Sequence, residues 1–223
     1  MDRQLHADAG SETPPLYPVF LALAGRKAVV AGGGTVASRK ISGLLECGAR
    51  VLVIAPEVVP EIEALAAAGT VELRRRPFAP ADMEGAFLAV AATDDPATNE
   101  LVFREGEARG ILVNAADDPA HSNFILPSLL RRGSLAIAVS TAGRSPALAV
   151  RIREELERRF GPEYATCLTI LGGLRDQVAA RFPDPDARKT FWYRLVDSDL
   201  LDAIRSGDED AVTRSIERAL EGA

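Results

Sequence analysis

Three consecutive glycines, Gly32 to Gly34, follow an apolar run over residues 27–31 and precede a segment with helical spacing. Glycines at such a turn let backbone amides approach a pyrophosphate, whose charge suits the amino end of the following helix. Here Gly32 suits the tight turn, Gly34 permits the close approach, and Ala37 is the small residue where the helix packs on its strand. Any turn between a strand and a helix also collects glycine, so an empty Rossmann-like fold is the alternative. The pattern favours a dinucleotide.

The end of the second apolar run, residues 51–54, bears on which dinucleotide is bound. Many NAD sites place an acidic residue there to hold the ribose hydroxyls, and here Glu57 follows Ala55 by two positions. Glu57 either reaches the ribose or starts the next helix, where a carboxylate suits the helix dipole. No arginine follows this strand end to receive a 2′-phosphate, so the sequence favours NAD over NADP.

A polar loop over residues 114–124 follows the fifth expected strand and should lie over the nicotinamide end of the cleft. Asp117 or Asp118 in this loop could accept a proton. Aspartate before Pro119 is also a common turn former, and spacing alone does not decide between the two interpretations. Asp94 and Asp95, after the fourth expected strand, are expected to be helix-capping residues rather than site residues.

The elements that position these residues alternate between strands and helices, which predicts an α/β fold with a doubly wound, Rossmann-like parallel sheet. Strands are expected over residues 27–31, 51–54, 71–75, 87–92 and 111–115. Helices are expected from the glycine turn to Gly48 and over residues 57–68 and 100–109.

The alternation ends after Pro119. Residues 124–126 and 135–139 are strand-like without a full crossover helix between them, which predicts a small separate sheet layer. A helix should begin at Pro146 and run to about residue 160, and amphipathic helices should follow from Pro162. The expected parts are a disordered tail (1–15), an NAD-binding domain (16–123), a dimerisation region (124–160) and a helical domain (161–223).

Composition restricts the function further. The chain has 223 residues, 47% of them hydrophobic, and a net charge of −6, which argues against non-specific nucleic-acid binding and a basic membrane-binding face. No signal peptide or membrane span is evident, so a cytoplasmic location is expected. Cys47 and Cys167 have no His or Cys partner at ligand spacing, so both are expected in the core and no metal site is expected.

Several motifs in order along the chain resemble a known family. They lie at residues 17–20, 91–95, 114–117, 122–128 and 138–146. Together they are similar to the dehydrogenase and ferrochelatase module of siroheme synthase, which also occurs as a stand-alone precorrin-2 dehydrogenase. The resemblance implies NAD-dependent oxidation of precorrin-2 to sirohydrochlorin, followed in bifunctional members by insertion of ferrous iron to give siroheme.

The resemblance also assigns residues. Asp117 matches the family's catalytic aspartate, which could serve as a base for both steps. The family's cofactor contacts match Thr35 and Val36 in the first turn and Pro56 and Glu57 after the second strand. With the glycine turn and the residue after the fourth strand, the expected cofactor site is Gly32, Gly34, Thr35, Val36, Pro56, Glu57 and Thr93.

The implied tetrapyrrole substrate carries many carboxylates, so an acidic protein must supply local cations and hydrogen-bond donors. Arg144 is the best placed cation, although without the resemblance it would be interpreted as a solvated turn residue. The expected substrate contacts are Asn114, His121, Ser140, Thr141, Arg144 and Ser145. Some members of the family have a serine that can be phosphorylated where this chain has Thr141, beside the Ser140 position. Control by phosphorylation is therefore not expected here. The arginines at 74–76 are expected to be a solvated strand end rather than a site.

The expected partners are a second copy of the chain, held through residues 124–160, and neither nucleic acid nor membrane. The sequence ends at Ala223 without a methyltransferase domain, so a separate uroporphyrinogen methyltransferase is expected to act upstream. Two alternatives remain: a dehydrogenase that relies on a separate chelatase, and a non-catalytic NAD-sensing regulatory module. A sensor would explain the glycine turn but not the Asp117 loop or residues 140–146.

Overall fold

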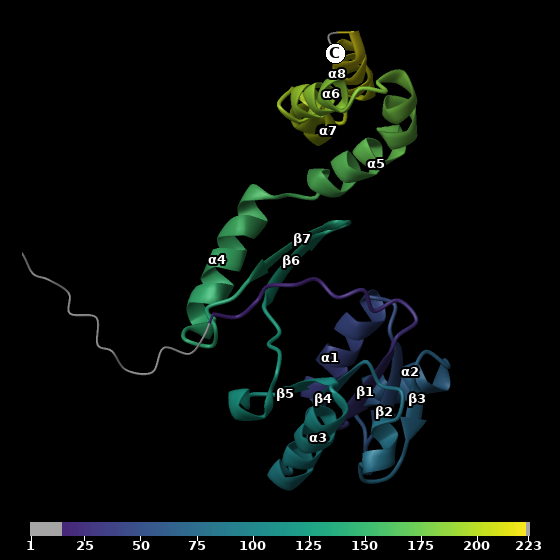
Figure 1. The fold of residues 1–223 in the computed structure, drawn as a ribbon, viewed down its shortest axis with the longest axis vertical. Helices are drawn as coiled ribbons and strands as arrows, with labels where there is room; N and C mark the ends of the chain where they lie inside the picture. Colours follow the sequence, from purple (N-terminus) through teal and green to yellow (C-terminus); the bar gives the residue numbers. More distant parts are fainter. Residues whose placement is uncertain (1–14, 222–223) are drawn as a thin grey trace, which may run out of the picture. The chain divides into compact units, whose positions relative to one another are not determined.

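The computed structural model describes residues 15–221, which fall into two compact units, Met1–Leu126 and Pro127–Ala223. The first contains the parallel sheet and the second contains a hairpin and helices (Figure 1). The tail expected over residues 1–15 lies outside the described residues except for Pro15, which is in no helix or strand. The expected division into three folded parts stays a prediction.

The first unit is built on a five-stranded parallel sheet, which confirms the predicted α/β fold class. The order across the sheet is β3 (Glu72–Arg74), β2 (Arg50–Ile54), β1 (Lys27–Ala31), β4 (Leu88–Ala91) and β5 (Leu112–Ala115). Every neighbouring pair is parallel. The central strands are continuous runs of buried apolar residues, as expected for a parallel sheet that is covered on both faces.

Helices cover both faces of this sheet. Its helices are α1 (Thr35–Glu46), α2 (Pro60–Ala67) and α3 (Pro96–Arg109), with a short 3₁₀ helix, η1 (Pro80–Met83). Ile41 of α1 and Ile62 of α2 belong to the core on one face. Val102 of α3 and Met83 of η1 belong to the core on the other. The doubly wound arrangement is therefore confirmed.

Two helix boundaries differ from the expectation. The helix expected from residue 57 begins at Pro60, because proline suits the first helical position. The helix expected from residue 100 begins at Pro96, where the Asp95 carboxylate accepts hydrogen bonds from the amides of Ala97 and Thr98, both at 3.2 Å. The predicted capping role is confirmed for Asp95, which is the N-cap of α3, whereas Asp94 is not.

The second unit begins with an antiparallel hairpin, β6 (Ser128–Arg132) and β7 (Leu135–Val139). A strand at 124–126 was the expectation, and it is wrong, because the segment around residue 124 is tied to the first unit. The Asn114 side-chain amide donates to the Phe124 carbonyl at 3.1 Å, and the Asn123 amide donates to the Val113 carbonyl at 3.0 Å. Pairing therefore starts only at Ser128.

The rest of the second unit is helical, as predicted. The helices are α4 (Pro146–Arg159), α5 (Glu163–Arg181), α6 (Pro185–Val196), α7 (Leu200–Ser206) and α8 (Glu209–Glu221). A core that includes Val178, Phe191, Leu195 and Leu200 joins α5 to α8. Between residues 15 and 221, no helix has both the length and the apolar content needed to cross a membrane.

Candidate functional site

The carboxyl ends of four strands form one aligned edge. In the register, Ala31 pairs with Ile54 and with Ala91, and Ala91 pairs with Ala115. The loops that follow β2, β1, β4 and β5 therefore begin side by side. With about 4.8 Å between neighbouring strands, this edge spans roughly 14 Å. It is the edge at which open α/β sheets bind ligands.

The glycine turn touches the loops on both sides of it. A Cβ on Gly32, whose φ is +127°, would lie 2.1 Å from the Ala92 carbonyl oxygen. A Cβ on Gly33 would lie 2.0 Å from the Glu57 carbonyl oxygen. Both positions therefore need glycine for packing. The requirement at Gly33 was not identified from the sequence, because it depends on a loop that is distant along the chain.

Gly34 differs from its two neighbours. A Cβ there would meet nothing within 4 Å, and its φ of −82° is accessible to any residue. Gly34 is the N-cap of α1, yet within residues 15–221 no side chain caps this helix, and its first turn carries no acidic residue. Uncapped amides facing open space suit an anion. These features fit the pyrophosphate of a dinucleotide.

The other residues expected around the cofactor lie beside this turn. Thr35 is exposed and Val36 half-buried in the first turn of α1, and Pro56 and Glu57 are exposed after β2. Glu57 lies three residues before α2 begins, so it does not start that helix. Its carboxylate lies on the loop that packs against Gly33.

Thr93 holds the loop after β4. Its hydroxyl accepts a hydrogen bond from the Asp95 amide at 3.2 Å and lies 2.9 Å from Oδ1 of Asn99. The Asn99 side-chain amide donates to the Thr93 carbonyl at 2.9 Å. Thr93 approaches the glycine turn through its main chain, since its nitrogen is 3.2 Å from a Cβ placed on Gly32. Asn99 is a supporting residue that sequence reasoning missed.

Asp117 lies at the tip of a tight turn directly after β5. Its φ is +59°, a left-handed conformation that aspartate tolerates better than most residues. The Ala116 amide donates to the Ala91 carbonyl at 2.8 Å, which fixes the start of the loop beside β4. Asp117 is exposed, and no side chain or amide of residues 15–221 hydrogen-bonds to its carboxylate.

Asp118 has a different environment. Its carboxylate accepts a hydrogen bond from the Ala120 amide at 3.1 Å and lies 2.6 Å from Nδ1 of His121. The bond to His121 lowers the pKa of Asp118. The turn interpretation that the sequence allowed for both aspartates therefore accounts for Asp118. The same interpretation does not account for Asp117, whose carboxylate makes no hydrogen bond within residues 15–221.

Lys40 was not identified from the sequence. It is half-buried on α1, four residues after Val36 and so on the same side of the helix. Burial lowers the pKa of the Lys40 ammonium, and the negative charge of Asp117 acts in the opposite direction. Lys40 therefore places a cation close enough to Asp117 for their charges to interact.

Asn114 and His121 are both committed to contacts within the loop. Asn114 is only 8% exposed, and its amide anchors the Phe124 carbonyl. The His121 ring packs edge-on against Phe103, with 5.5 Å between the ring centroids. Each supports the loop that carries Asp117, and a direct contact with substrate stays a prediction.

The remaining predicted substrate contacts belong to the second unit and form a turn before α4. The Ser140 hydroxyl accepts a hydrogen bond from the amide two residues later at 3.0 Å, and the Thr141 hydroxyl accepts one from the Ser145 amide at 3.1 Å. The Ser145 hydroxyl caps α4 through the Leu148 amide at 3.3 Å. Arg144 is exposed on this turn.

The arginines at 74–76 are 41–49% exposed, which agrees with a solvated strand end, and each of them is also ion-paired. Arg74 and Arg76 both pair with Asp82, whose side chain is 1% exposed. Arg75 pairs with Glu63. Hydrogen bonds from Arg76 lower the pKa of Asp82 despite its burial. This cluster joins the end of β3 to η1.

Both cysteines pack with apolar residues. Cys167 is buried, which raises the pKa of its thiol, and Cys47 is half-buried against the core of the first unit. Within residues 15–221, no group of three or more His, Cys, Asp or Glu side chains could hold a metal ion.

Three family models match successive parts of the chain. Residues 19–128 match "Putative NAD(P)-binding", residues 132–159 match "Sirohaem biosynthesis protein central" and residues 163–220 match "Sirohaem synthase dimerisation region". The first match covers the sheet and the glycine turn. The description as a dimerisation region falls on α5 to α8, beyond the segment 124–160 that the sequence suggested for the dimer.

Individual relatives agree with these matches. The chain is 42% identical over 204 residues to the siroheme synthase of Chromobacterium violaceum and 40% identical over 205 residues to that of Thioalkalivibrio sulfidiphilus, covering 92% of this chain in each case. It spans less than half of these relatives, 43% and 42% of their lengths. The solved structure of SirC, precorrin-2 dehydrogenase, is 30% identical with a TM-score of 0.76, and the match covers 93% of this chain and 100% of that one. The chain therefore belongs to the family of siroheme synthase and precorrin-2 dehydrogenase.

Proposed function

We propose that this protein oxidises precorrin-2 to sirohydrochlorin with NAD as the hydride acceptor. The observation that carries the proposal is the shared strand edge, where the uncapped amino end of α1 follows β1 and the exposed Asp117 carboxylate follows β5, with β4 between the two strands. The NAD(P)-binding family match and the likeness to a solved precorrin-2 dehydrogenase support it.

The glycine turn and the loop after β2 would hold the cofactor. The α1 amides and the open side of Gly34 suit its pyrophosphate, and the exposed Glu57 carboxylate suits ribose hydroxyls. Thr35, Val36, Pro56 and Thr93 complete the proposed contacts. When bound, NAD supplies the hydride-accepting nicotinamide.

The charges at the end of β3, the strand next to β2, favour NAD over NADP. Arg74 lies at the end of β3, next to β2, where a 2′-phosphate could otherwise be received. Arg74 and Arg76 are both held by the buried Asp82. Arg74 also pairs with Glu72, so two carboxylates balance the two guanidinium groups, while Glu57 would repel a 2′-phosphate.

Asp117 would take the proton. Oxidation of the macrocycle removes a hydride, which the cofactor accepts, and a proton, which needs a base. The Asp117 carboxylate suits this task because it is exposed and has no hydrogen-bond partner within residues 15–221. The Lys40 ammonium lies close enough for its charge to interact with this carboxylate.

The substrate's carboxylates require complementary groups. Arg144 offers an exposed cation, and Ser140, Thr141 and Ser145 offer hydroxyls on the same turn. Asn114 and His121 lie in or beside the Asp117 loop and are the substrate contacts that we propose for the first unit.

Insertion of ferrous iron into sirohydrochlorin is a second candidate activity. The relatives are named siroheme synthases, and siroheme is the iron-containing product. Iron would enter as a substrate, and Asp117 could accept the pyrrole protons that the metal displaces. Purified protein incubated with sirohydrochlorin and ferrous iron, without NAD, tests this step, and no siroheme absorbance would leave metallation to a separate chelatase.

The proposed assembly is a homodimer, supported by the match of residues 163–220 to a dimerisation region. A cytoplasmic location and a separate upstream uroporphyrinogen methyltransferase stay predictions.

The test of the oxidation is a coupled assay of precorrin-2 with NAD, followed by absorbance as the macrocycle becomes more conjugated. Asp117→Ala should lower the rate by about two or more orders of magnitude, the scale of a lost general base, with NAD affinity near normal. Asp94→Ala is the matched control, because Asp94 is also an exposed carboxylate just beyond a strand of this edge. Equal losses in the two variants, or a largely active Asp117→Asn, would mean that Asp117 is not a specific base.

A further inference from the structure

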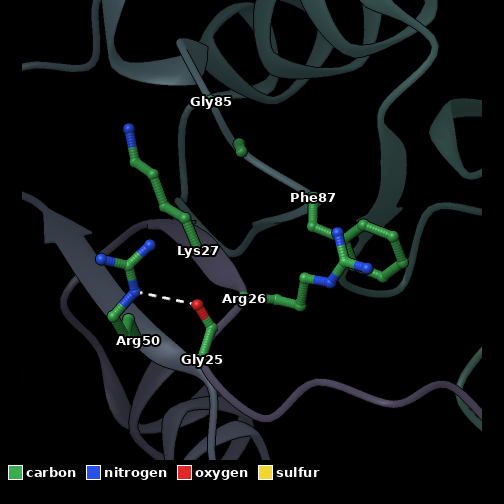
Figure 2. A pocket seen from close by; sticks show the side chains of 7 residues that line it. Gly25, Arg26, Lys27, Arg50, Gly85 and Phe87 are labelled. Atoms are coloured by element: carbon green, nitrogen blue, oxygen red, sulfur yellow. Dashed lines mark hydrogen bonds between the residues drawn. The ribbon is translucent and has the colours of Figure 1, made fainter.

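A pocket lies at the opposite, amino edge of the same sheet (Figure 2). It has a volume of about 360 Å³ and is lined by Gly25, Arg26, Lys27, Arg50, Gly85, Ala86 and Phe87. Three of these residues are cationic, in a protein whose net charge is −6. The length of β1, five residues at about 3.3 Å each, separates this pocket from the glycine turn by roughly 16 Å.

The Lys27 ammonium is held without being neutralised. It donates to the carbonyl oxygen of Asp82 at 3.0 Å and to that of Glu84 at 2.6 Å. Both acceptors are uncharged backbone groups, and an ammonium has three donors. One donor and the full positive charge therefore remain for a ligand.

Arg50 is arranged in the same way. Its Nε donates to the Gly25 carbonyl oxygen at 2.9 Å, which orients the side chain and leaves its terminal nitrogens for another acceptor. The register places Arg50 directly beside Lys27 on neighbouring parallel strands. Figure 2 shows these two side chains on one side of the pocket.

Arg26 completes the cationic lining. Its guanidinium lies over the Phe87 ring, 5.0 Å from the centroid, so the ring orients it without reducing its charge (Figure 2). Within residues 15–221, none of Arg26, Lys27 and Arg50 forms an ion pair with a carboxylate. Like charges on adjacent strands repel, and an anion between them would remove that cost.

We propose that this pocket binds a small phosphate-bearing anion, at a site separate from the cofactor turn. Phosphate fits this lining because its several oxygens can accept from an ammonium and from planar guanidinium groups at once. The site is independent of the proposed oxidation, because none of its residues contributes to the carboxyl edge.

Calorimetric titration of the full chain with inorganic pyrophosphate tests the proposal. Arg26→Gln and Arg50→Gln should each weaken binding about tenfold or more, whereas Arg50→Lys should lose less than Arg50→Gln because a cation remains. Arg104→Gln is the matched control, since Arg104 is exposed on α3 and loses the same charge. It should bind like the wild type.

Two further measurements identify the site and the ligand chemistry. Gly34→Asp should not change pyrophosphate affinity at this pocket; loss of binding in that variant alone would place pyrophosphate at the cofactor turn and overturn the proposal. Binding that falls equally in Arg104→Gln, no binding at millimolar pyrophosphate, or equal affinity for citrate would also overturn it. NAD titration of Arg50→Gln, expected to match the wild type, keeps this result separate from the proposed oxidation.

Discussion

Replacing Gly34 by aspartate should change the stability of the fold and its affinity for NAD in opposite directions. A Cβ at this position would meet no atom within 4 Å and stands at a φ of −82°, so it adds no clash or backbone strain. It also supplies the missing cap of α1, because an N-cap carboxylate accepts from the first-turn amides. We expect a gain of roughly 0.5 kcal/mol in the free energy of unfolding.

The same carboxylate occupies the amides that the pyrophosphate needs. At about 5 Å and an effective dielectric constant of about 20, repulsion between the two anions costs about 3 kcal/mol. A factor of ten corresponds to about 1.4 kcal/mol, so NAD affinity should fall by about 100-fold. Dehydrogenation should fall with it, while any iron insertion into supplied sirohydrochlorin should survive.

Urea unfolding and NAD titration by calorimetry measure the two effects. Gly43→Asp is the matched control, because Gly43 is also open on α1 but lies far from its amino end, so NAD affinity should not change. Gly33→Ala is the contrasting variant, since its methyl would overlap the Glu57 carbonyl and destabilise the fold. Wild-type NAD affinity in Gly34→Asp would refute the cofactor assignment, and a stability loss like that of Gly33→Ala would refute the open geometry.

Two further predictions concern acid stability and assembly. Asp82→Asn should lower the free energy of unfolding at pH 7 by about 1.5 to 3 kcal/mol, the scale of losing hydrogen bonds to a charged group, because Asp82 is buried while Arg74 and Arg76 are 41% and 42% exposed. Because Arg76 holds the pKa of Asp82 below its usual value, this contribution is present above about pH 4 and is lost as pH falls through the folded-state pKa. The difference between variant and wild type should therefore narrow in urea unfolding at pH 3, and an unchanged difference would contradict this origin. Light scattering of the full chain should give a mass near twice 23.7 kDa at micromolar concentration. Truncation after residue 160 should show whether α5 to α8 or residues 124–160 hold the dimer. A monomeric full chain would contradict both assignments.

The sheet and the position of its ligand-binding edge could be predicted because their determinants are local. Each central strand is a short apolar run, and the glycine turn follows the first of them directly. The helix boundaries were less accurate, because proline and aspartate at the first turn mattered more than the apolar spacing. The strand expected at 124–126 failed because Asn114, a residue of another strand, holds the Phe124 carbonyl.

The residues missed in the site depend on contacts between distant segments. Lys40 and Asp117 are 77 positions apart, and only the packing of α1 beside the β5 loop brings their charges together. Gly33 is required by the Glu57 carbonyl, whereas the motif alone gives no reason to separate it from Gly34. Sequence spacing predicts which loops meet at an edge but not which atoms meet.

The two adjacent aspartates show how backbone geometry separates residues that sequence treats as equal. Asp118 turns inward to cap the following 3₁₀ turn and to bind His121, so its negative charge has local partners. Asp117 takes the left-handed conformation at the tip, which turns its carboxylate away from those donors and leaves it exposed. A general base must be ionised and unoccupied when substrate arrives. Because Asp118 fixes the turn, Asp118→Ala should impair the reaction by loosening the Asp117 loop, so NAD affinity and loop exchange rates, rather than activity alone, must distinguish the two roles.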